Sequence, residues 1–353
     1  MIVVGAGPAG LLCAKEAASL GAKVTVYEEH KEVGEPVKCT GLISKKGLDK
    51  LAVGYEDSVL NECRGARFYS PNGTELEVKK SGPVALVVDR AVLDKAIAEE
   101  AQSEGVEIIT GKKWEGKCDV AADGPLSKWG PKRQYVHAYQ VTADLEKETD
   151  FVEIHWTPEF FAWVVPVNNK ECRVGIGVRT GRWPEGNAMA PGNPKEALMK
   201  WLHSKKMELE YDNEASALIP LFDNSPAVVD GTCLVGDAAA HVKATTGGGV
   251  AIGGFNARIC GAVLGENRKP ADYEALWREE YGKDLGMHRR IRNMLDKIPP
   301  SEMDGLFELA NSEGLAKTIE RHGDMERPWP LLNALMQKPG LAMKMMKYAK
   351  YLQ

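Results

Sequence analysis

The sequence has few of the features that mark membrane-spanning or nucleic-acid-binding proteins. No run of about 20 residues is apolar enough to span a bilayer, and the best candidate, residues 247–265, is glycine-rich and contains Arg258. Neither sign of charge dominates, since 45 Lys and Arg stand against 50 Asp and Glu. A chain so close to neutral lacks the basic field that attracts nucleic acid. We therefore expect no membrane span and no nucleic-acid partner.

Cysteine pairs are also missing. The seven cysteines are scattered, and no two of them form a C-x-x-C motif. This spacing excludes a zinc knuckle and an iron–sulfur cluster, so we predict no metal site. Free thiols are typical of a reducing compartment, and the first ten residues lack the basic and continuous apolar regions of a signal peptide. The sequence predicts a cytoplasmic protein.

The chain does contain enough apolar residues for a large core. Apolar residues make up 44% and charged residues 27% of 353 residues, which is ordinary for a globular protein. This length predicts two or three folding units.

The first thirty residues carry the clearest motif. A β-branched run at residues 2–4 leads into GAGPAG at residues 5–10, a helical stretch, and a second strand that ends at Glu28. This order is typical of the dinucleotide-binding βαβ unit. Gly5 permits the tight turn, Gly7 lets the backbone approach a pyrophosphate, and Gly10 lets helix and strand pack closely. Glu28 is expected to bind ribose hydroxyls.

Two later segments are typical of the remainder of such a domain. One is a strand that runs into a turn at Asp123-Gly124. The other is a buried strand that ends at Gly236-Asp237 and is followed by Gly247-Gly248-Gly249 and a helix of small residues. Asp237 has two interpretations, which are compatible with each other: a ligand contact at the carboxyl end of a strand and the N-cap of the next helix.

Periodicity predicts an α/β fold: a Rossmann-like dinucleotide-binding domain, whose later segments resemble those of FAD-binding domains, with an inserted α+β domain and C-terminal helices. We assign residues 1–60, 84–130 and 225–268 to the discontinuous FAD-binding domain. Alternating strands at 61–83 and 131–224 form the antiparallel-sheet substrate domain, which includes a helix at 194–204. Residues 269–353 form the helical region, with breaks at Pro299, Pro328 and Pro339.

These motifs resemble the geranylgeranyl reductase family of flavoproteins, within the para-hydroxybenzoate hydroxylase superfamily, over about the first 265 residues. Residues 5–10 with Glu28, the D-R-x-x-x-D segment 89–94, and Gly236-Asp237 with residues 245–249 resemble its FAD motifs. Residues 36–41 resemble its P-x-x-C-x-G segment, and residues 161–166 its Y-x-W-x-F-P cavity motif, with Phe and Val at two positions. One departure is that residues 110–119 are short where the family carries a β-meander, which either thins one side of the FAD domain or leaves room for a partner protein.

The resemblance implies a set of FAD contacts: Gly5, Gly7, Pro8, Ala9, Gly10, Glu28, Glu29, Cys39, Gly41, Arg90, Asp123, Gly124, Gly236, Asp237, Gly247, Gly248, Gly249 and Val250.

The resemblance implies an enzyme that saturates C=C bonds of a geranylgeranyl or other isoprenoid chain, such as that of a membrane lipid, by hydride transfer from reduced FAD. Cys39, Phe161 and Trp163 are the catalytic candidates. Phe160, Phe161, Trp163, Val165 and Pro166 are expected to line the substrate cavity, although an aromatic strand of this kind is also typical of a core. Cys39 is either a proton donor or a buried apolar side chain.

Other questions stay open at this point. His241 is a second candidate proton source or a structural histidine, and Lys38 is a flavin contact or a solvated charge. No second glycine motif marks an NADPH domain, so a ferredoxin, a deazaflavin or NADPH could supply electrons. The lysine-rich stretch 331–353 is either a capping helix or a peripheral membrane contact. Two other functions use the same FAD motifs: a monooxygenase or halogenase, and an electron-transfer flavoprotein that works in a complex.

Overall fold

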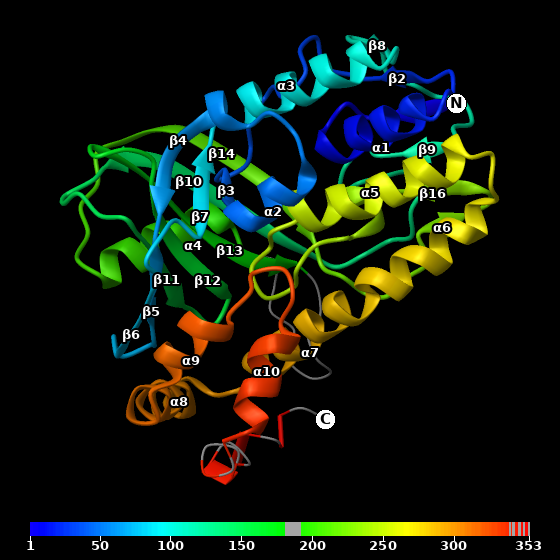
Figure 1. Ribbon diagram of the computed structural model, residues 1–353. Helices are drawn as coiled ribbons and strands as arrows, with labels where there is room; N and C mark the ends of the chain where they lie inside the picture. The colour runs from blue at the N-terminus through cyan, green and yellow to red at the C-terminus, as the bar shows by residue number, and fades with distance from the viewer. Residues whose placement is uncertain (181–191, 339, 341–342, 345–346, 349, 352–353) are drawn as a thin grey trace.

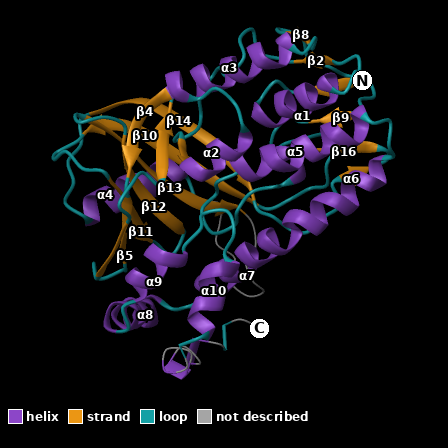
Figure 2. Cartoon of the chain, in the orientation of Figure 1, coloured by secondary structure: helices purple, strands orange, loops and turns teal. Residues whose placement is uncertain are grey.

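The computed structural model describes residues 1–180, 192–338, 340, 343–344, 347–348 and 350–351. Three sheets and a set of helices make up these residues (Figures 1 and 2). Among them, no helix combines the length and the apolarity needed to cross a bilayer.

A six-stranded sheet is assembled from three separated stretches of the chain. Its order is β15-β16-β9-β1-β2-β8, and all neighbours are parallel except β15 and β16. The strands are β1 (Ile2–Val4), β2 (Thr25–Tyr27), β8 (Glu107–Ile109), β9 (Val120–Ala121), β15 (Val228–Val229) and β16 (Thr232–Leu234). The Rossmann-like fold predicted for the cofactor domain is therefore confirmed, while the exact domain boundaries stay a prediction.

One helix lies against this sheet and a second helix lies beside the first. The helix α1 (Pro8–Ser19) begins with a proline, which needs no N–H partner there, and the chain leaves it through Gly21 at φ +90°. The small-residue helix α5 (Val250–Gly265) packs along α1 (Figure 1). A Cβ at Gly261 would lie 2.3 Å from the carbonyl oxygen of Cys13, so glycine allows the close packing here. The helix α3 (Arg90–Ser103) also contacts α1.

The second sheet has seven strands in the order β14-β10-β13-β12-β11-β5-β6. All neighbours are antiparallel except β11 and β5. Its strands are β5 (Gly65–Tyr69), β6 (Glu75–Lys79), β10 (Tyr135–Asp144), β11 (Phe151–Trp156), β12 (Phe160–Pro166), β13 (Glu171–Thr180) and β14 (Tyr211–Pro220). The predicted helix at residues 194–204 is present as α4 (Pro194–Ser204) and packs Leu198, Trp201 and Leu202 against this sheet.

The strands of a small antiparallel sheet lie, along the sequence, between strands of the two larger sheets. It contains β3 (Leu42–Ser44), β7 (Ala85–Val88) and β4 (Val59–Cys63). The short helices α2 (Lys45–Leu51) and η1 (Glu56–Ser58) flank β3 and β4. The short segment 110–119 contains no strand, and its Trp114 stacks on Tyr27 with ring centroids 4.3 Å apart.

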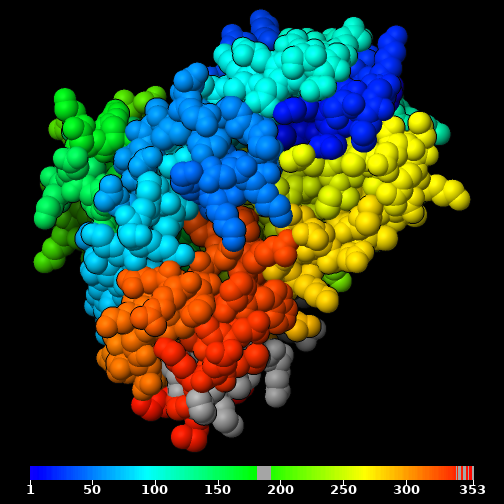
Figure 3. All heavy atoms as spheres, viewed as in Figure 1, coloured from blue at the N-terminus to red at the C-terminus, as the bar shows by residue number. Residues whose placement is uncertain are grey.

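The C-terminal region is helical, as predicted. Its elements are α6 (Pro270–Trp277), η3 (Arg278–Gly282), α7 (Lys283–Lys297), α8 (Pro300–Ser312), α9 (Leu315–His322) and α10 (Trp329–Met336). The predicted breaks at Pro299 and Pro328 coincide with the starts of α8 and α10, while Pro339 and much of 339–353 lie outside the described residues. The orange and red C-terminal residues pack below the blue residues around α2 (Figure 3).

Candidate functional site

The turn between β1 and α1 is a backbone cradle that Glu28 holds in shape. The Ala6 N–H donates a 2.8 Å hydrogen bond to Glu28 Oε2. Glu28 Oε1 accepts a bond from the His30 N–H and lies 2.6 Å from His30 Nδ1. A carboxylate offers about four lone-pair sites, so Glu28 keeps the capacity to accept further bonds from a ribose.

The glycines of the cradle differ in what surrounds them. A Cβ at Gly5 would lie 2.2 Å from the Ala122 carbonyl oxygen, and one at Gly10 would lie 2.0 Å from the Gly5 carbonyl oxygen. Apart from its chain neighbours, no described residue has a heavy atom within 4 Å of a Cβ placed at Gly7. Gly5 and Gly10 are therefore required by packing, whereas Gly7 leaves open space beside a helix N-terminus, where a phosphate binds well.

Asp237 follows β16 in the short turn η2 (Gly236–Ala239), close to the cradle, since a Cβ at Gly236 would lie 2.7 Å from Ala9 Cβ. Burial raises the pKa of Asp237 to about 6, with Arg90 acting in the opposite direction. Neither η2 nor α5 has a side-chain hydrogen bond at its N-cap. Of the two interpretations of Asp237, the N-cap is therefore wrong, and the side chain lines the cavity instead.

Cys39 lies among cationic groups from two other elements. Its Sγ accepts the Gly41 N–H at 3.3 Å, and Arg90 is in hydrogen-bond contact with it. Arg90 also donates two bonds, of 2.9 and 2.8 Å, to the buried Asp94. Burial alone would lower the pKa of Arg90, but Asp94 and Cys39 outweigh it and raise that pKa. Arg90 therefore stays charged, and Arg173 fixes the same loop with a 2.6 Å bond to the Thr40 carbonyl.

An aromatic wall is provided by β12. The Phe160 and Phe161 rings lie 4.6 Å apart, and Phe161 meets Trp163 edge to face at 5.9 Å. The indole of Trp163 lies over Gly175 of β13, its register partner, since a Cβ there would be 2.3 Å from Trp163 Cζ2. Phe160, Phe161, Trp163 and Val165 line the cavity, while Pro166 does not. Pro166 instead offers its carbonyl to Asn61 Nδ2 at 2.9 Å.

One cavity of about 1820 Å³ joins the glycine cradle to this aromatic wall. Typical ligand pockets measure about 300–1,000 Å³, so there is room for a large cofactor together with a second molecule. Of the twenty residues predicted as FAD contacts or catalytic residues, fifteen line it: Gly5, Gly7, Glu28, Glu29, Cys39, Arg90, Asp123, Gly124, Phe161, Trp163, Asp237, Gly247, Gly248, Gly249 and Val250. Pro8, Ala9, Gly10, Gly41 and Gly236 are not among the lining residues.

His241 does not take part in the site. It is fully buried against Trp277, with ring centroids 4.5 Å apart, and does not line the cavity. Burial, reinforced by Arg133 and Arg278, lowers its pKa to about 3. The interpretation of His241 as a proton source is therefore wrong, because the ring is neutral and out of reach. Lys38, in contrast, lines the cavity.

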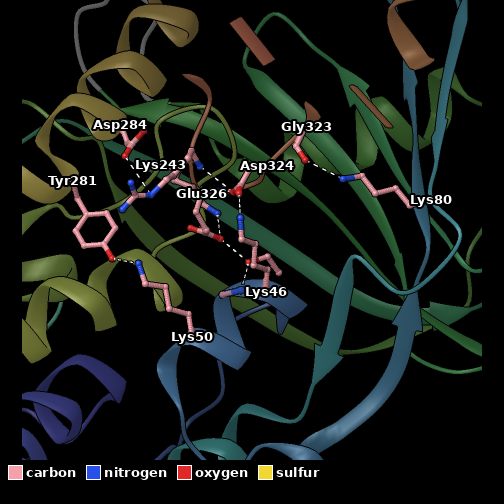
Figure 4. Close-up of polar contacts among 12 residues, drawn as sticks. Lys46, Lys50, Lys80, Lys243, Tyr281, Asp284, Gly323, Asp324 and Glu326 are labelled. Atoms are coloured by element: carbon pink, nitrogen blue, oxygen red, sulfur yellow. Dashed lines mark hydrogen bonds and ion pairs between the residues drawn. The ribbon is translucent and has the colours of Figure 1, made fainter. Parts of the chain in front are cut away.

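The sequence did not predict that the C-terminal region also lines the cavity. Residues 319, 321–326, 330 and 331 are part of its wall. Three lysines from elsewhere in the chain hold the segment Gly323–Arg327 in place (Figure 4). Lys46 forms an ion pair with Asp324, Lys80 donates to the Gly323 carbonyl, and Lys243 forms an ion pair with Glu326. Such pairs join residues far apart in the chain, so no local pattern marks them.

The cradle, the open space at Gly7 and the large cavity together fit FAD. This fit agrees with comparisons with known proteins. Residues 3–41 match the model of the NAD(P)-binding Rossmann-like domain.

A relative and two solved structures extend the comparison over most of the chain. The digeranylgeranylglycerophospholipid reductase of Methanosarcina acetivorans is 27% identical, over 87% of this chain and 87% of the relative. A geranylgeranyl bacteriochlorophyll reductase-like protein of Thermoplasma acidophilum has a TM-score of 0.79 at 20% identity and covers 98% of each chain. A flavin-dependent brominase has a TM-score of 0.67 at 15% identity, over 96% of this chain and 98% of its own. The resemblance to geranylgeranyl reductases is thus confirmed.

Proposed function

We propose that this protein is an FAD-dependent reductase that saturates C=C bonds of a geranylgeranyl or related isoprenoid chain, with a membrane lipid as its substrate. One observation carries this proposal: a single cavity connects a dinucleotide cradle to a wall of aromatic and aliphatic side chains. The reductase names of the relatives support it.

Residues at three places would hold FAD. The cradle at Gly7 takes the pyrophosphate, Glu28 takes the ribose of the adenosine half, and Asp237 with the glycines 247–249 takes the other half. When bound and reduced, FAD supplies a hydride to one carbon of an alkene, and a proton completes the other carbon.

The aromatic wall suits a substrate without polar groups. An isolated alkene has no carbonyl to polarise, so binding depends on apolar area removed from water, at about 25 cal/mol per Å². Phe161 and Trp163 supply this area and exclude water. Cys39 lies on the same cavity wall and either delivers the proton or shapes the wall. A Cys39→Ser variant keeps an exchangeable proton, whereas Cys39→Ala does not, so only the first role predicts a difference between them.

We further propose that the cavity opens toward a lipid surface. The helix α10 is apolar, yet none of its residues is buried. Trp329 and Met325 are each 38% exposed and Met336 is 71% exposed, while Pro330 and Leu331 of α10 line the cavity. Apolar chains could enter there without crossing water. Sedimentation with lipid vesicles should be lost in a Trp329→Glu/Met336→Glu variant that still binds FAD.

An anaerobic assay tests the reductase. The flavoprotein is reduced chemically and mixed with a geranylgeranyl lipid in one cuvette and with air in another. We expect reoxidation by the lipid and a product mass gain of two hydrogens per bond.

The same assay distinguishes the second candidate, a monooxygenase or halogenase, for which the fold likeness to a brominase is the supporting observation. That function predicts no reoxidation by the lipid and a rapid reaction with oxygen.

A further inference from the structure

A buried ion pair joins the glycine loop at residues 243–249 to the C-terminal segment. Lys243 is 4% exposed and Glu326 is 6% exposed, and both line the cavity. Lys243 Nζ lies 2.8 Å from Glu326 Oε1, which also accepts a 2.7 Å bond from Ser44 Oγ. Figure 4 shows the pair at the centre of the polar contacts around Gly323–Arg327.

The ammonium group lies directly against the glycine loop. A Cβ at Gly248 would be 3.4 Å from Lys243 Nζ. The loop closes on Lys243 through its backbone, because the Lys243 N–H donates to the Gly248 carbonyl and the Gly247 N–H donates to the Lys243 carbonyl. The charge therefore sits beside the glycine loop, which the proposed function assigns to the flavin half of the cofactor.

A second connection runs parallel to the ion pair. His288 Nδ1 lies 2.7 Å from Thr245 Oγ1, and His288 Nε2 lies 3.3 Å from the Glu326 carbonyl oxygen. Since a carbonyl only accepts, Nε2 carries the proton and Nδ1 accepts from the Thr245 hydroxyl. The loop and the segment are thus tied at two points.

Reduction adds negative charge to a flavin, so a nearby cation favours the reduced form. In this site the cation is compensated by Glu326, whose other oxygen, Oε2, has no hydrogen-bond partner among the described residues. The compensation depends on the C-terminal segment being in place.

We propose that Lys243 and Glu326 are positioning residues that set the reduction potential of the bound cofactor through their balance of charge. The inference rests on the proposed function, because it requires bound FAD. It goes further by giving the C-terminal segment a part in the electron chemistry.

The experiment measures the midpoint potential of the purified FAD protein against reference dyes. Glu326→Gln leaves the ammonium uncompensated and should raise the potential. Lys243→Met leaves the carboxylate and should lower it. The double variant restores the charge balance and should return toward the wild-type potential. We expect each single shift to change the ratio of reduced to oxidised flavin at least about tenfold, which is about 30 mV for two electrons.

Arg327→Gln is the matched control. The substitution breaks a 2.5 Å contact between the same segment and Glu280, and Arg327 does not line the cavity. Its potential should equal that of the wild type. If Glu326→Gln does not fold by itself, the effect of Glu326 is measured in the Lys243→Met background. The double variant must then have a higher midpoint potential than Lys243→Met, because it lacks the carboxylate.

The outcomes are distinguishable. Equal potentials in all variants that bind FAD overturn the inference and leave the reductase proposal standing. A shift in Arg327→Gln as large as in Glu326→Gln also overturns it, because loosening of the segment would then suffice. A wild-type protein that binds no FAD overturns the proposed function, and the inference with it.

Discussion

Two glycine-to-alanine substitutions in one turn should distinguish the stability of the fold from the binding of FAD. In Gly10→Ala the new Cβ would lie 2.0 Å from the Gly5 carbonyl oxygen and 3.0 Å from Ala122 Cβ. Backbone must move to relieve this contact, and overpacking of this kind costs about 1–3 kcal/mol of unfolding free energy. In Gly7→Ala the methyl has no heavy atom within 4 Å in the part of the chain that the structure describes, its two chain neighbours excepted. Gly7 is also the N-cap of α1, with φ −75°, which alanine adopts freely, so we expect a change below about 1 kcal/mol.

The effect on FAD should show the opposite order. The Gly7 methyl occupies the space beside the helix N-terminus, and an overpacking cost of about 1–3 kcal/mol there corresponds to about 5- to 150-fold weaker binding. Denaturant unfolding of the protein without FAD and flavin fluorescence titration measure the two quantities. If Gly7→Ala unfolds as easily as Gly10→Ala, or binds FAD as the wild type does, the close-approach role of Gly7 is refuted.

Three other substitutions test the walls of the site. Gly175→Ala should destabilise the protein by about 1–3 kcal/mol, seen as easier denaturant unfolding. It should also push the Trp163 indole into the cavity and raise the KM for long isoprenoid chains, and an unchanged KM would contradict this. Arg90→Ala leaves the buried Asp94 unpaired and should cost about 3–5 kcal/mol in the same assay, and Arg90→Lys clearly less. Burial, helped by Lys243, lowers the pKa of His288 from 6.5 to about 4. The unfolded chain therefore takes up a proton first as pH falls, and the unfolding free energy should drop by about 3 kcal/mol between pH 6.5 and 4; His288→Gln should lack this part of the pH profile.

The cofactor half of the fold could be predicted because its signals are local. Strand, glycine turn and helix follow each other within residues 2–19. The positive φ of Gly5 and the close contact of Gly10 with the Gly5 carbonyl arise within that turn. Asp89 is similar, since its carboxylate caps α3 only two and three residues away, at Ala91 and Val92.

The substrate half of the site depends on contacts that no short window contains. The position of Trp163 comes from its register opposite Gly175, and Lys243 meets Glu326 across 83 residues. His241 shows the converse, because its place next to Gly236-Asp237 suggested chemistry, but packing against Trp277 turned the ring into the core. The local sequence identifies candidate residues, and tertiary contacts decide which way their side chains face.

The long separations within this site have a consequence for how the protein acquires its cofactor during synthesis. Ser44 and Glu326, which share a hydrogen bond, are separated by 282 residues, and a ribosome adding about 5–20 residues per second needs roughly 15–60 s to make that interval. The cradle is synthesised early, but β9 can pair with β16 only after β16 has been made. The cavity wall is complete only after its C-terminal residues have been made. FAD therefore meets a complete site only after the C-terminal helices have been made, and the nascent cradle spends roughly 15–60 s with its apolar neighbours not yet synthesised.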